Sequence, residues 1–517
     1  MALMPRVLIV GGGLAGLSAA LFLNWYGAEA VLVERRRETS TLPKARRINV
    51  RTVEIFRQIG IAERVLAASR TVEFRAGEQL ASAGPSVVAA QPLDLPRPPG
   101  PGPADVTPVQ TCLCAQDLLE PVLREIAAER GVELRFGVEC DDWCADTDGI
   151  TATVHAGDGA TETLRADYLI AADGAHSEIR ERLGIARSGR GAMETLVNIE
   201  FHADLSGLVD DCENRIFQID NEQVSGGLAG AGGGRWFFTT AGYHNLSDGE
   251  WAEAMRAAIG VPDIAVRVDR VMEWTPGMFI ADRFAAGRVF LVGDAAHVMP
   301  PYAALGANTG IQAAHNLAWK LADVMRGAAS ARLLDTYHDE RRPVGWFTAD
   351  QSSLRSAADL RRKYGTSPDG TALADPTVLI LGARYRSAAV IDDGSTAPTD
   401  HFALSGQPGT RLPHRPLDRD RSTLDLIGPD FALLTGPDAA HWKPAVDAAA
   451  RPGLRLHGLD AAWAESVGLE DTGALLVRPD QVVAWRTRRA PDDPVRALRN
   501  SLDRVLLRSE AVAVEDI

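Results

Sequence analysis

The sequence opens with an apolar segment, a glycine-rich turn and a helical stretch, a pattern that strongly limits the possible folds. Gly11, Gly13 and Gly16 follow VLIV with the spacing G-x-G-x-x-G, and Glu34 ends the next apolar segment, VLVE. In a strand–turn–helix unit, such glycines allow a tight turn, close approach of a pyrophosphate, and close helix packing. The helix N-terminus offers N–H groups to phosphates, and Glu34 can accept hydrogen bonds from ribose hydroxyls. The segment predicts a Rossmann-type site for an adenine dinucleotide, either NAD or FAD.

Length and charge limit the class of protein further. A chain of 517 residues exceeds the usual size of one domain and predicts two or three. The formal net charge of −15 disfavours nucleic acid and anionic membranes as partners. No apolar run reaches the roughly 18 residues that span a bilayer, and the first strand begins too early for a signal peptide. We expect a cytoplasmic protein without nucleic-acid or membrane partners.

The five cysteines form no complete redox or metal motif. They include Cys112 and Cys114, but the sequence has no C-x-x-C pair, and no histidine completes a zinc set. We expect buried, reduced thiols and no bound metal. The segment that begins near residue 400 contains no cysteine. Its α/β pattern and closing hairpin predict a small thioredoxin-like domain without thiol chemistry.

A second motif, D-G-x-x-S-x-x-R, follows the buried strand pattern YLIA. It consists of Asp173, Gly174, Ser177 and Arg180. Arg180 could neutralise a pyrophosphate, and the Asp–Gly turn lets a phosphate-bearing group approach the backbone. An Asp–Gly pair alone would indicate only a turn.

A third motif lies in RVFLVGDAAHVMPPYAALGANTG. Asp294 follows Gly293 at a strand end, where its carboxylate can accept hydrogen bonds from a polyol such as a ribityl chain. Pro300 and Pro301 stiffen the next loop. Gly306 then begins a helix whose N–H groups could stabilise negative charge on a flavin, and Asn308 could bond the flavin ring.

In this order, the three motifs resemble those of class A flavoprotein monooxygenases, the para-hydroxybenzoate hydroxylase family. The resemblance covers about residues 1–390, through G-x-G-x-x-G, D-G-x-x-S-x-x-R and G-D-A-x-H. The C-terminal segment is similar to the phenol-hydroxylase branch, which includes actinomycete hydroxylases of aromatic polyketides. The resemblance implies an α/β fold: a Rossmann-type FAD-binding domain with an inserted β-rich substrate domain and a C-terminal thioredoxin-like domain.

These domains are expected to alternate along the chain, because the nucleotide-binding motifs are separated by alternating strand patterns such as RWFFTTAGYH. The expected parts are an FAD-binding domain at 1–73, 100–189 and 280–395 (with connecting helices), a β-rich substrate domain at 74–99 and 190–279, and a thioredoxin-like domain without C-x-x-C at 400–517.

The resemblance also implies which residues contact FAD. Glu34 would bind the ribose and Asp294 the ribityl chain. Arg46, or its neighbour Arg47, would lie near the pyrophosphate, and Gln116 near the flavin. The full cofactor-binding set is Gly11, Gly13, Leu14, Ala15, Gly16, Glu34, Arg35, Arg46, Gln116, Asp173, Arg180, Gly293, Asp294, Pro301, Gly306, Ala307 and Asn308.

Candidates for direct action on the substrate are fewer, because the cofactor carries the chemistry in such enzymes. Tyr302 and Pro300 lie on the expected flavin loop and are the candidate catalytic residues. Phe237 and Tyr243, together with Tyr302, are candidates for lining the substrate cavity, with core packing as the alternative. His297 resembles a family position whose role is structural.

The function that the resemblance implies is hydroxylation of an aromatic, polycyclic phenolic intermediate of the polyketide type. It would use FAD, NADPH or NADH as a transient co-substrate, and O₂, through a flavin C4a-hydroperoxide. A homodimer is a further expectation from the resemblance. Two alternatives remain open at this point. One is Baeyer–Villiger-type or other oxidative flavin chemistry, and the other is a non-catalytic FAD-binding scaffold that sequesters an intermediate.

One departure from the family pattern concerns the flavin loop. The pattern P-P-x-G-G-x-G-x-N-x-G is altered here, because Ala303 and Ala304 replace its first two glycines. Each alanine adds a methyl group and restricts positive φ. The departure leaves FAD binding intact but predicts altered flavin mobility or a reshaped oxygen pocket.

Overall fold

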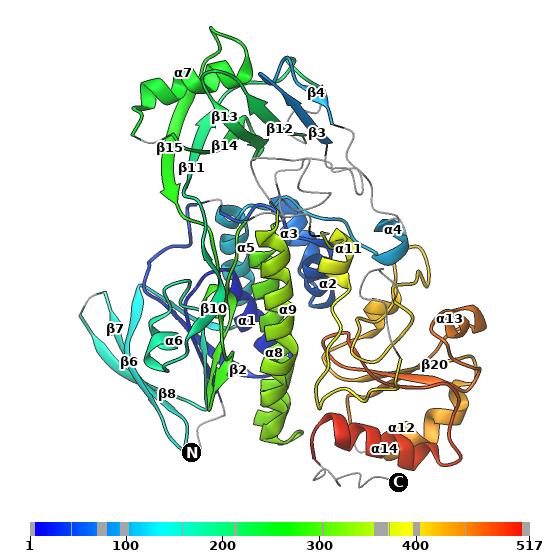
Figure 1. Cartoon of the computed structure of the whole chain (residues 1–517). Coiled ribbons are helices and arrows are strands. Elements are labelled where there is room, and N and C mark those ends of the chain that lie inside the picture. The colour runs from blue at the N-terminus through cyan, green and yellow to red at the C-terminus, as the bar shows by residue number, and fades with distance from the viewer. Residues whose placement is uncertain are drawn as a thin grey trace.

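The computed structural model of the chain has a central body with two further units attached to it (Figure 1). The seven-stranded sheet lies at the top of this view and the C-terminal unit at the lower right. The structure describes residues 6–42, 44–69, 80–93, 103–157, 159–210, 215–243, 245–301, 304–355, 371, 373–395, 404–449 and 451–508.

A six-stranded, mainly parallel sheet forms the centre of the body. Its order is β17-β18-β9-β1-β2-β5, and only β17 and β18 pair antiparallel. Val7, Leu8 and Ile9 of β1 are fully buried, as expected for a parallel strand covered on both faces. The strands are β1 (Arg6–Val10), β2 (Glu29–Glu34), β5 (Glu133–Phe136), β9 (Tyr168–Ala171), β17 (Ala285–Ala286) and β18 (Val289–Leu291).

Helices pack around this sheet, and α1 contacts both α5 and α8. The helices of the body are α1 (Leu14–Trp25), α2 (Val50–Gln58), α3 (Ala62–Ala68), α4 (Pro103–Val106), α5 (Gln116–Glu129), α6 (Glu178–Arg182), α8 (Gly306–Met325), α9 (Asp335–Ser353) and α11 (Pro376–Leu381), with short 3-10 turns η2 (Gly293–Ala295) and η3 (Ala331–Leu334).

A second, β-rich lobe has its own apolar core. Its seven-stranded sheet has the order β15-β11-β14-β13-β12-β3-β4, and α7 packs against it. The strand β3 comes from an earlier part of the chain and pairs in parallel with β12. The elements are β3 (Leu80–Gly84), β4 (Gln91–Pro92), β11 (Leu196–His202), β12 (Arg215–Asp220), β13 (Ser225–Gly230), β14 (Arg235–Ala241), α7 (Asp248–Ile259) and β15 (Arg267–Trp274).

Two three-stranded sheets complete the N-terminal part. One is the antiparallel meander β6 (Val138–Ala145), β7 (Ile150–Ala156) and β8 (Thr161–Ala166). The other joins β10 (Arg187–Ala192), β16 (Gly277–Ala281) and β19 (His297–Val298). The domain boundaries proposed from the sequence at 189/190 and 279/280 both fall inside strands of this second sheet, which connects the body to the lobe.

The C-terminal unit contains a four-stranded sheet in the order β21-β20-β22-β23. One pair is parallel and two are antiparallel, which agrees with the thioredoxin-like arrangement. One set of its residues joins the core of the body and another forms a separate core. The elements are η4 (Thr423–Leu426), β20 (Ala432–Thr435), η5 (Ala439–Trp442), α12 (Lys443–Ala448), β21 (Arg455–Gly458), α13 (Ala461–Ser466), β22 (Ala474–Val477), β23 (Val483–Thr487) and α14 (Pro494–Val505).

The turn between β22 and β23 attaches this unit to the body. Arg478, fully buried, forms ion pairs with Glu340 of α9, at 2.6 Å, and with Asp480. Gln58 of α2 donates to the carbonyl of Pro479 at 2.8 Å. The contact between the two parts is therefore polar as well as apolar.

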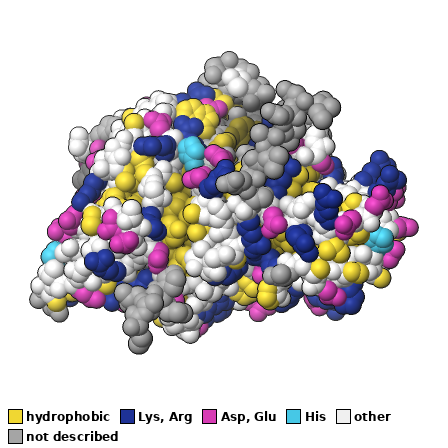
Figure 2. Space-filling view, turned by 90° about the horizontal axis from the view of Figure 1, so that it is seen from below, with side chains coloured by type: hydrophobic (Ala, Val, Ile, Leu, Met, Phe, Trp, Pro, Cys, Tyr) yellow, Lys and Arg dark blue, Asp and Glu magenta, His cyan; other side chains and the backbone are white. Residues whose placement is uncertain are grey.

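The surface carries charges of both signs. On the face shown in Figure 2, basic and acidic side chains of the described residues are interspersed rather than gathered into one basic field. Among the described helices, none combines the length and apolar character needed to cross a bilayer.

Candidate functional site

The glycine turn after β1 has the shape expected of a phosphate-binding loop. Gly11 has φ +111°, and a Cβ there would lie 2.2 Å from the Ala172 carbonyl oxygen. A Cβ on Gly16 would lie 1.9 Å from the Gly11 oxygen. A Cβ on Gly13 would meet only Glu120 Oε1, at 3.7 Å. The first and third glycines are therefore required by packing, while the second borders open space.

Glu34 contacts this turn from the end of β2. Its Oε2 accepts the Gly12 N–H at 2.6 Å and its Oε1 accepts the Arg36 N–H at 2.9 Å. Each carboxylate oxygen retains a further lone pair for a ribose hydroxyl. Neighbouring Arg35 is exposed.

Gln116 begins α5 beside the same turn. Its backbone N–H donates to the Ala45 carbonyl at 2.7 Å, and its Nε2 donates to Glu120 Oε1 at 2.6 Å. Burial raises the pKa of Glu120, against the lowering effect of the N–H groups of Ser40 and Gln116. These bonds place Gln116 next to the segment that carries Arg46.

The N-termini of α1 and α8 meet across Gly293. A Cβ on Gly293 would lie 2.8 Å from the Ala15 methyl group, and one on Gly310 would lie 2.9 Å from Gly293 Cα. Neither helix has a side-chain cap or an acidic residue in its first turn. The first N–H groups of each helix, including those of Gly306 and Ala307, have no partner within the helix, so both ends can receive an anionic or electron-rich group.

The D-G-x-x-S-x-x-R motif is held together mainly by its own contacts. Asp173 Oδ2 accepts the Ile179 N–H at 3.2 Å, while the buried Oδ1 has no partner among the described residues. Burial raises the pKa of Asp173. Arg180 is buried, and its guanidinium donates to the Ala175 carbonyl at 3.3 Å and pairs with Glu181 at 3.0 Å. In this structure Arg180 therefore fixes the turn, a contact set that the motif did not predict.

Asp294, the middle residue of η2, is exposed although its neighbours Gly293 and Ala295 are buried. It therefore faces an opening in the fold. The surrounding protein raises the pKa of its carboxyl group, and the charge of Lys44 opposes this effect. A carboxylate in such an opening can accept hydrogen bonds from a polyol.

The loop before α8 is shaped by Asn308. Its Nδ2 donates to the carbonyls of Ala304, at 2.8 Å, and Arg47, at 2.9 Å, and its Oδ1 accepts the Asn49 N–H at 3.0 Å. Both amide hydrogens are thus used on the protein backbone, whereas the sequence suggested a bond to the flavin ring. Asn308 connects the α8 loop to the segment that carries Arg46.

Ala304 has φ +54°, a left-handed conformation that favours glycine. The Pro300 carbonyl accepts a hydrogen bond from the Ser352 hydroxyl at 2.8 Å, and Pro301 is exposed. Tyr302 and Ala303 lie outside the described residues, so the proposed catalytic role of Tyr302 stays a prediction.

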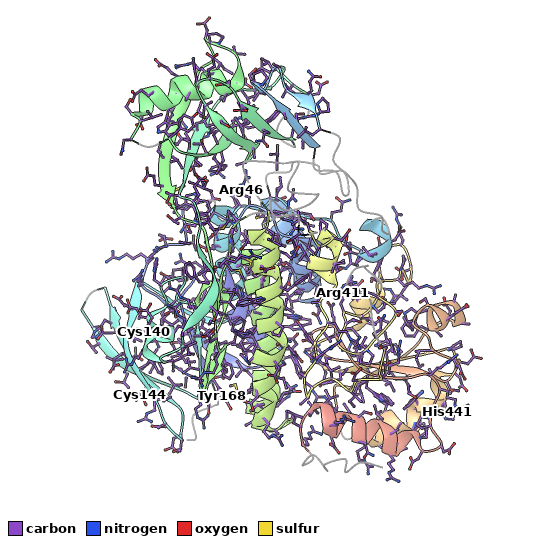
Figure 3. All side chains as sticks on the ribbon, viewed as in Figure 1. Arg46, Cys140, Cys144, Tyr168, Arg411 and His441 are labelled. Atoms are coloured by element: carbon purple, nitrogen blue, oxygen red, sulfur yellow. The ribbon has the colours of Figure 1, made fainter. Side chains whose placement is uncertain are left out.

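Arg46, Arg47 and Arg235 lie close together where the lobe meets the body. Arg46, labelled in Figure 3 at this junction, donates to the Gly230 carbonyl at 3.0 Å and lies 5.2 Å from the centre of the Phe237 ring. Burial lowers the pKa of Arg46 to about 10, with further lowering by Arg47 and Arg235. Arg235 in turn pairs with Asp117 at 2.9 Å. The Arg235–Asp117 pair was not predicted, and its only sequence signal is a charge at the start of an apolar strand.

Two further candidates from the sequence are Tyr243 and His297. Tyr243 packs against the apolar core of the lobe, so the described contacts do not bring it to Phe237. His297 is fully buried, and burial lowers its pKa to about 4, which keeps the ring neutral at pH 7. Both properties agree with a structural role for His297.

The expectation that the cysteines are buried was only partly right. Cys112 and Cys114 are buried, but Cys140 is only partly buried and Cys144 is exposed, so the expectation of buried thiols was wrong for Cys144. These two lie on β6, an edge strand with an exposed face. Among the described residues, no cluster of histidine, cysteine and acidic side chains could hold a metal ion.

Comparisons with known proteins agree with this geometry. The family of FAD binding domains matches residues 4–352, more than half of the chain, and the family of aromatic-ring hydroxylase C-terminal domains matches residues 405–508. The chain is 41% identical to the tetracenomycin B2 monooxygenase-dioxygenase of Streptomyces olivaceus, covering 97% of this chain and 99% of that protein. It is 37% identical to the 4-methyl-5-nitrocatechol 5-monooxygenase of a Burkholderia species, covering 97% of each.

Among solved structures, the chain is similar to the ternary complex of aklavinone-11 hydroxylase with FAD and aklavinone. The TM-score is 0.85 at 32% identity, covering 98% of this chain and 99% of that one. The chain belongs to the FAD-dependent aromatic-ring hydroxylases, and it is an FAD-dependent monooxygenase that uses NAD(P)H. The family and fold predicted from the three motifs are thereby confirmed.

Proposed function

We propose that this monooxygenase adds one oxygen atom to the ring of a polycyclic phenolic compound of the aromatic polyketide type. Its likeness to the tetracenomycin B2 and aklavinone-11 enzymes over nearly the whole chain supports this substrate class. The observation that carries the proposal is the meeting of two uncapped helix N-termini, α1 and α8, below an arginine-lined junction with the lobe.

The residues of the body fit FAD. The open space at Gly13, the exposed carboxylate of Asp294 and the unpartnered Oδ1 of Asp173 are groups that the protein alone leaves unused. We assign Glu34 to the ribose, the α1 N-terminus to the pyrophosphate, and the α8 N-terminus to the flavin edge. When bound, FAD accepts a hydride from NAD(P)H and supplies O₂ activation, chemistry that no side chain here provides.

The protein's own contribution is to orient and ionise the substrate. Phe237, with its ring near Arg46, offers an aromatic surface for a planar ring system. The guanidinium of Arg46 would favour the phenolate, because a nearby positive charge lowers the pKa of a phenol. A phenolate ring is more electron-rich and therefore accepts an electrophilic oxygen more readily.

The test is anaerobic reduction of the FAD-loaded protein by NADH and by NADPH, with and without a panel of polycyclic phenols and quinones. Aerobic products are then identified by mass spectrometry and NMR. A ring hydroxyl and a gain of one oxygen atom support the proposal. A ring-expanded lactone would indicate Baeyer–Villiger chemistry instead, and oxidation of NAD(P)H without any oxygenated product would refute the proposed substrate class.

We further propose that the protein is cytoplasmic, as its sequence suggested, and that it is a homodimer, as the resemblance to the family suggests. Light scattering coupled to gel filtration measures the mass of the particle directly. A monomeric mass for the FAD-loaded protein at micromolar concentration would contradict the dimer.

A further inference from the structure

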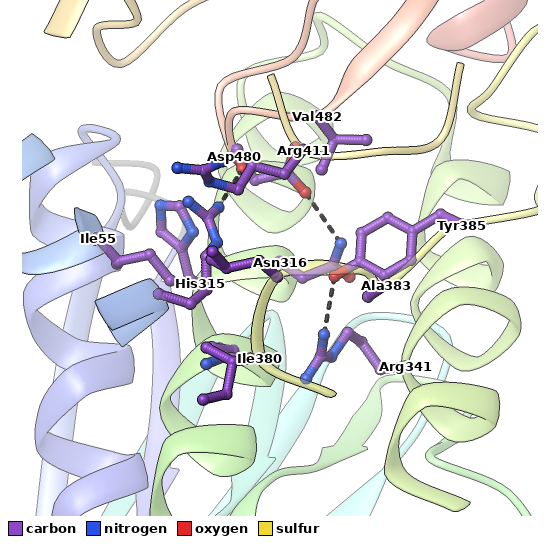
Figure 4. Close-up of a pocket in the computed structure, with 13 residues that line it drawn as sticks. Ile55, His315, Asn316, Arg341, Ile380, Ala383, Tyr385, Arg411, Asp480 and Val482 are labelled. Carbon is purple, nitrogen blue, oxygen red and sulfur yellow. Dashed lines mark hydrogen bonds between the residues drawn. The ribbon is translucent and has the colours of Figure 1, made fainter. Parts of the chain in front are cut away.

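A small cavity lies where the C-terminal unit meets the body, away from the glycine turn. Its volume is about 40 Å³, enough for a few water molecules or one small ion with water. Figure 4 shows side chains from α2, α8, α9, the end of α11 and the segment after it that carries Tyr385, and the C-terminal unit converging on this cavity. None of these residues belongs to the proposed FAD or substrate contacts.

The charges in and next to this cavity do not balance. Glu54 pairs with Arg51 and Arg411, and Glu340 pairs with Lys320 and Arg478. Among the described residues, the charged groups are the cations Arg51, Lys320, Arg341, Arg411 and Arg478 and the carboxylates Glu54, Glu340 and Asp480. The group has five positive and three negative charges, and it is almost completely buried.

Of these five cations, Arg341 is the one that has no carboxylate partner among the described residues. It is 2% exposed. Its Nη1 donates to the Tyr385 hydroxyl at 2.8 Å and its Nη2 to the Thr309 carbonyl at 3.2 Å, and both acceptors are uncharged. Its Nε has no acceptor among the described residues. A buried guanidinium with only neutral acceptors is costly, since its charge is removed from water without compensation.

Arg411 presents a second unused donor to the same region. Its Nε and Nη2 bond Glu54, and Nη2 also donates to the Val106 carbonyl at 2.9 Å. Arg411 is 3% exposed and lines the cavity. Its buried Nη1 has no partner among the described residues. Two arginines therefore bring unpaired N–H groups to one enclosed space.

The other polar residues of the lining cannot supply the missing negative charge. Burial lowers the pKa of His315 to about 3, with Arg51 adding to the effect, so its ring is neutral. Burial also raises the pKa of Tyr385, which keeps its hydroxyl protonated. Asn316 donates through Nδ2 to Glu340 and Asp480, which leaves its Oδ1 as an unpartnered acceptor suited to a water molecule.

We propose that this cavity is a binding site for a small monovalent anion of the chloride class, held by the free N–H groups of Arg341 and Arg411 and accompanied by water on Asn316. The anion compensates one of the two excess positive charges. It connects α9 of the body to the C-terminal unit, and it acts as a structural ligand of their junction.

Two measurements on the FAD-loaded protein test this site. Crystals grown or soaked in sodium bromide are examined by anomalous diffraction, with a bromide peak expected in the cavity beside Arg341 and Arg411. In solution, sodium gluconate is replaced stepwise by sodium chloride at constant ionic strength. Because a ligand that binds only the folded state stabilises it, we expect a saturable rise in Tm of about 1–2 °C.

The matched variants are Arg341→Met and Arg342→Met. Arg342 is the next residue on α9, but it contacts the Ala281 carbonyl and does not line the cavity. The chloride-dependent rise should disappear in R341M and persist in R342M. A cavity that holds only water in bromide crystals, or a chloride effect that R342M loses equally, overturns the proposal. If R341M does not fold, the bromide map of the unaltered protein decides.

Discussion

Replacing Ala304 by glycine should stabilise the protein, although glycine substitutions usually destabilise. Ala304 has φ +54°, and its carbonyl accepts one of the two Nδ2 hydrogens of Asn308. A left-handed conformation costs an alanine roughly 1–2 kcal/mol, while the greater freedom of glycine in the unfolded chain costs about 0.4–1 kcal/mol. The difference favours A304G by about 1 kcal/mol. No hydrogen bond is lost, because the contacts at this position are made by the backbone.

The assay is the urea midpoint of the FAD-loaded protein, followed by flavin fluorescence and by far-UV circular dichroism. Ala307→Gly is the matched control, because Ala307 lies in the first turn of α8 and is not among the residues with positive φ. We expect A307G to lose about 0.5–1 kcal/mol. The reasoning is refuted if A304G lowers the midpoint as much as A307G does, since strain at Ala304 would then be absent.

Three further changes test other parts of the site. Glu34→Gln should weaken FAD binding about 10- to 100-fold, because a charged acceptor is replaced by a neutral one, and fluorescence titration of the apoprotein would measure it; unchanged affinity would remove Glu34 from the site. Asn308→Ala should destabilise by about 1–3 kcal/mol, since one buried and two partly buried backbone groups lose a partner, and a change below about 0.5 kcal/mol in denaturant unfolding would contradict this role. His297→Gln should flatten the decline of stability between pH 6.5 and 4: the folded pKa is about 4, so the unfolded chain binds the proton first as pH falls and stability is lost across this window. An unchanged slope of urea midpoint against pH would show that His297 does not titrate in this way.

Local features of the site could be predicted from the sequence, because they depend on neighbours in the chain. The glycine turn, the carboxylate at the end of β2 and the small residues at Gly293 follow from spacing and from the order of strands. Long-range pairs could not be predicted in the same way. The Arg235–Asp117 pair joins residues 118 positions apart, and nothing in either local pattern identifies the partner.

The sequence also could not decide whether a polar side chain binds the cofactor or another part of the protein. Arg180 and Asn308 both have side chains suited to a cofactor, and both also bond the protein in this structure. Motif chemistry specifies what a side chain can bind, whereas its neighbours in three dimensions determine what it binds. The resemblance to a family predicted which residues could contact the cofactor, but not their contacts with the rest of the protein.

The turn between β22 and β23 makes the C-terminal unit difficult to exchange. Glu340 and Glu54 are almost completely buried residues of the body, and part of their charge compensation comes from Arg478 and Arg411, which follow residue 404. A truncated or chimeric chain that supplied a different terminal unit would leave Glu54 with Arg51 alone and Glu340 with Lys320 alone. Breaking a buried ion pair typically costs about 3–5 kcal/mol. Recombination between family members should therefore succeed only when α2, α9, this turn and the segment that carries Arg411 are inherited together.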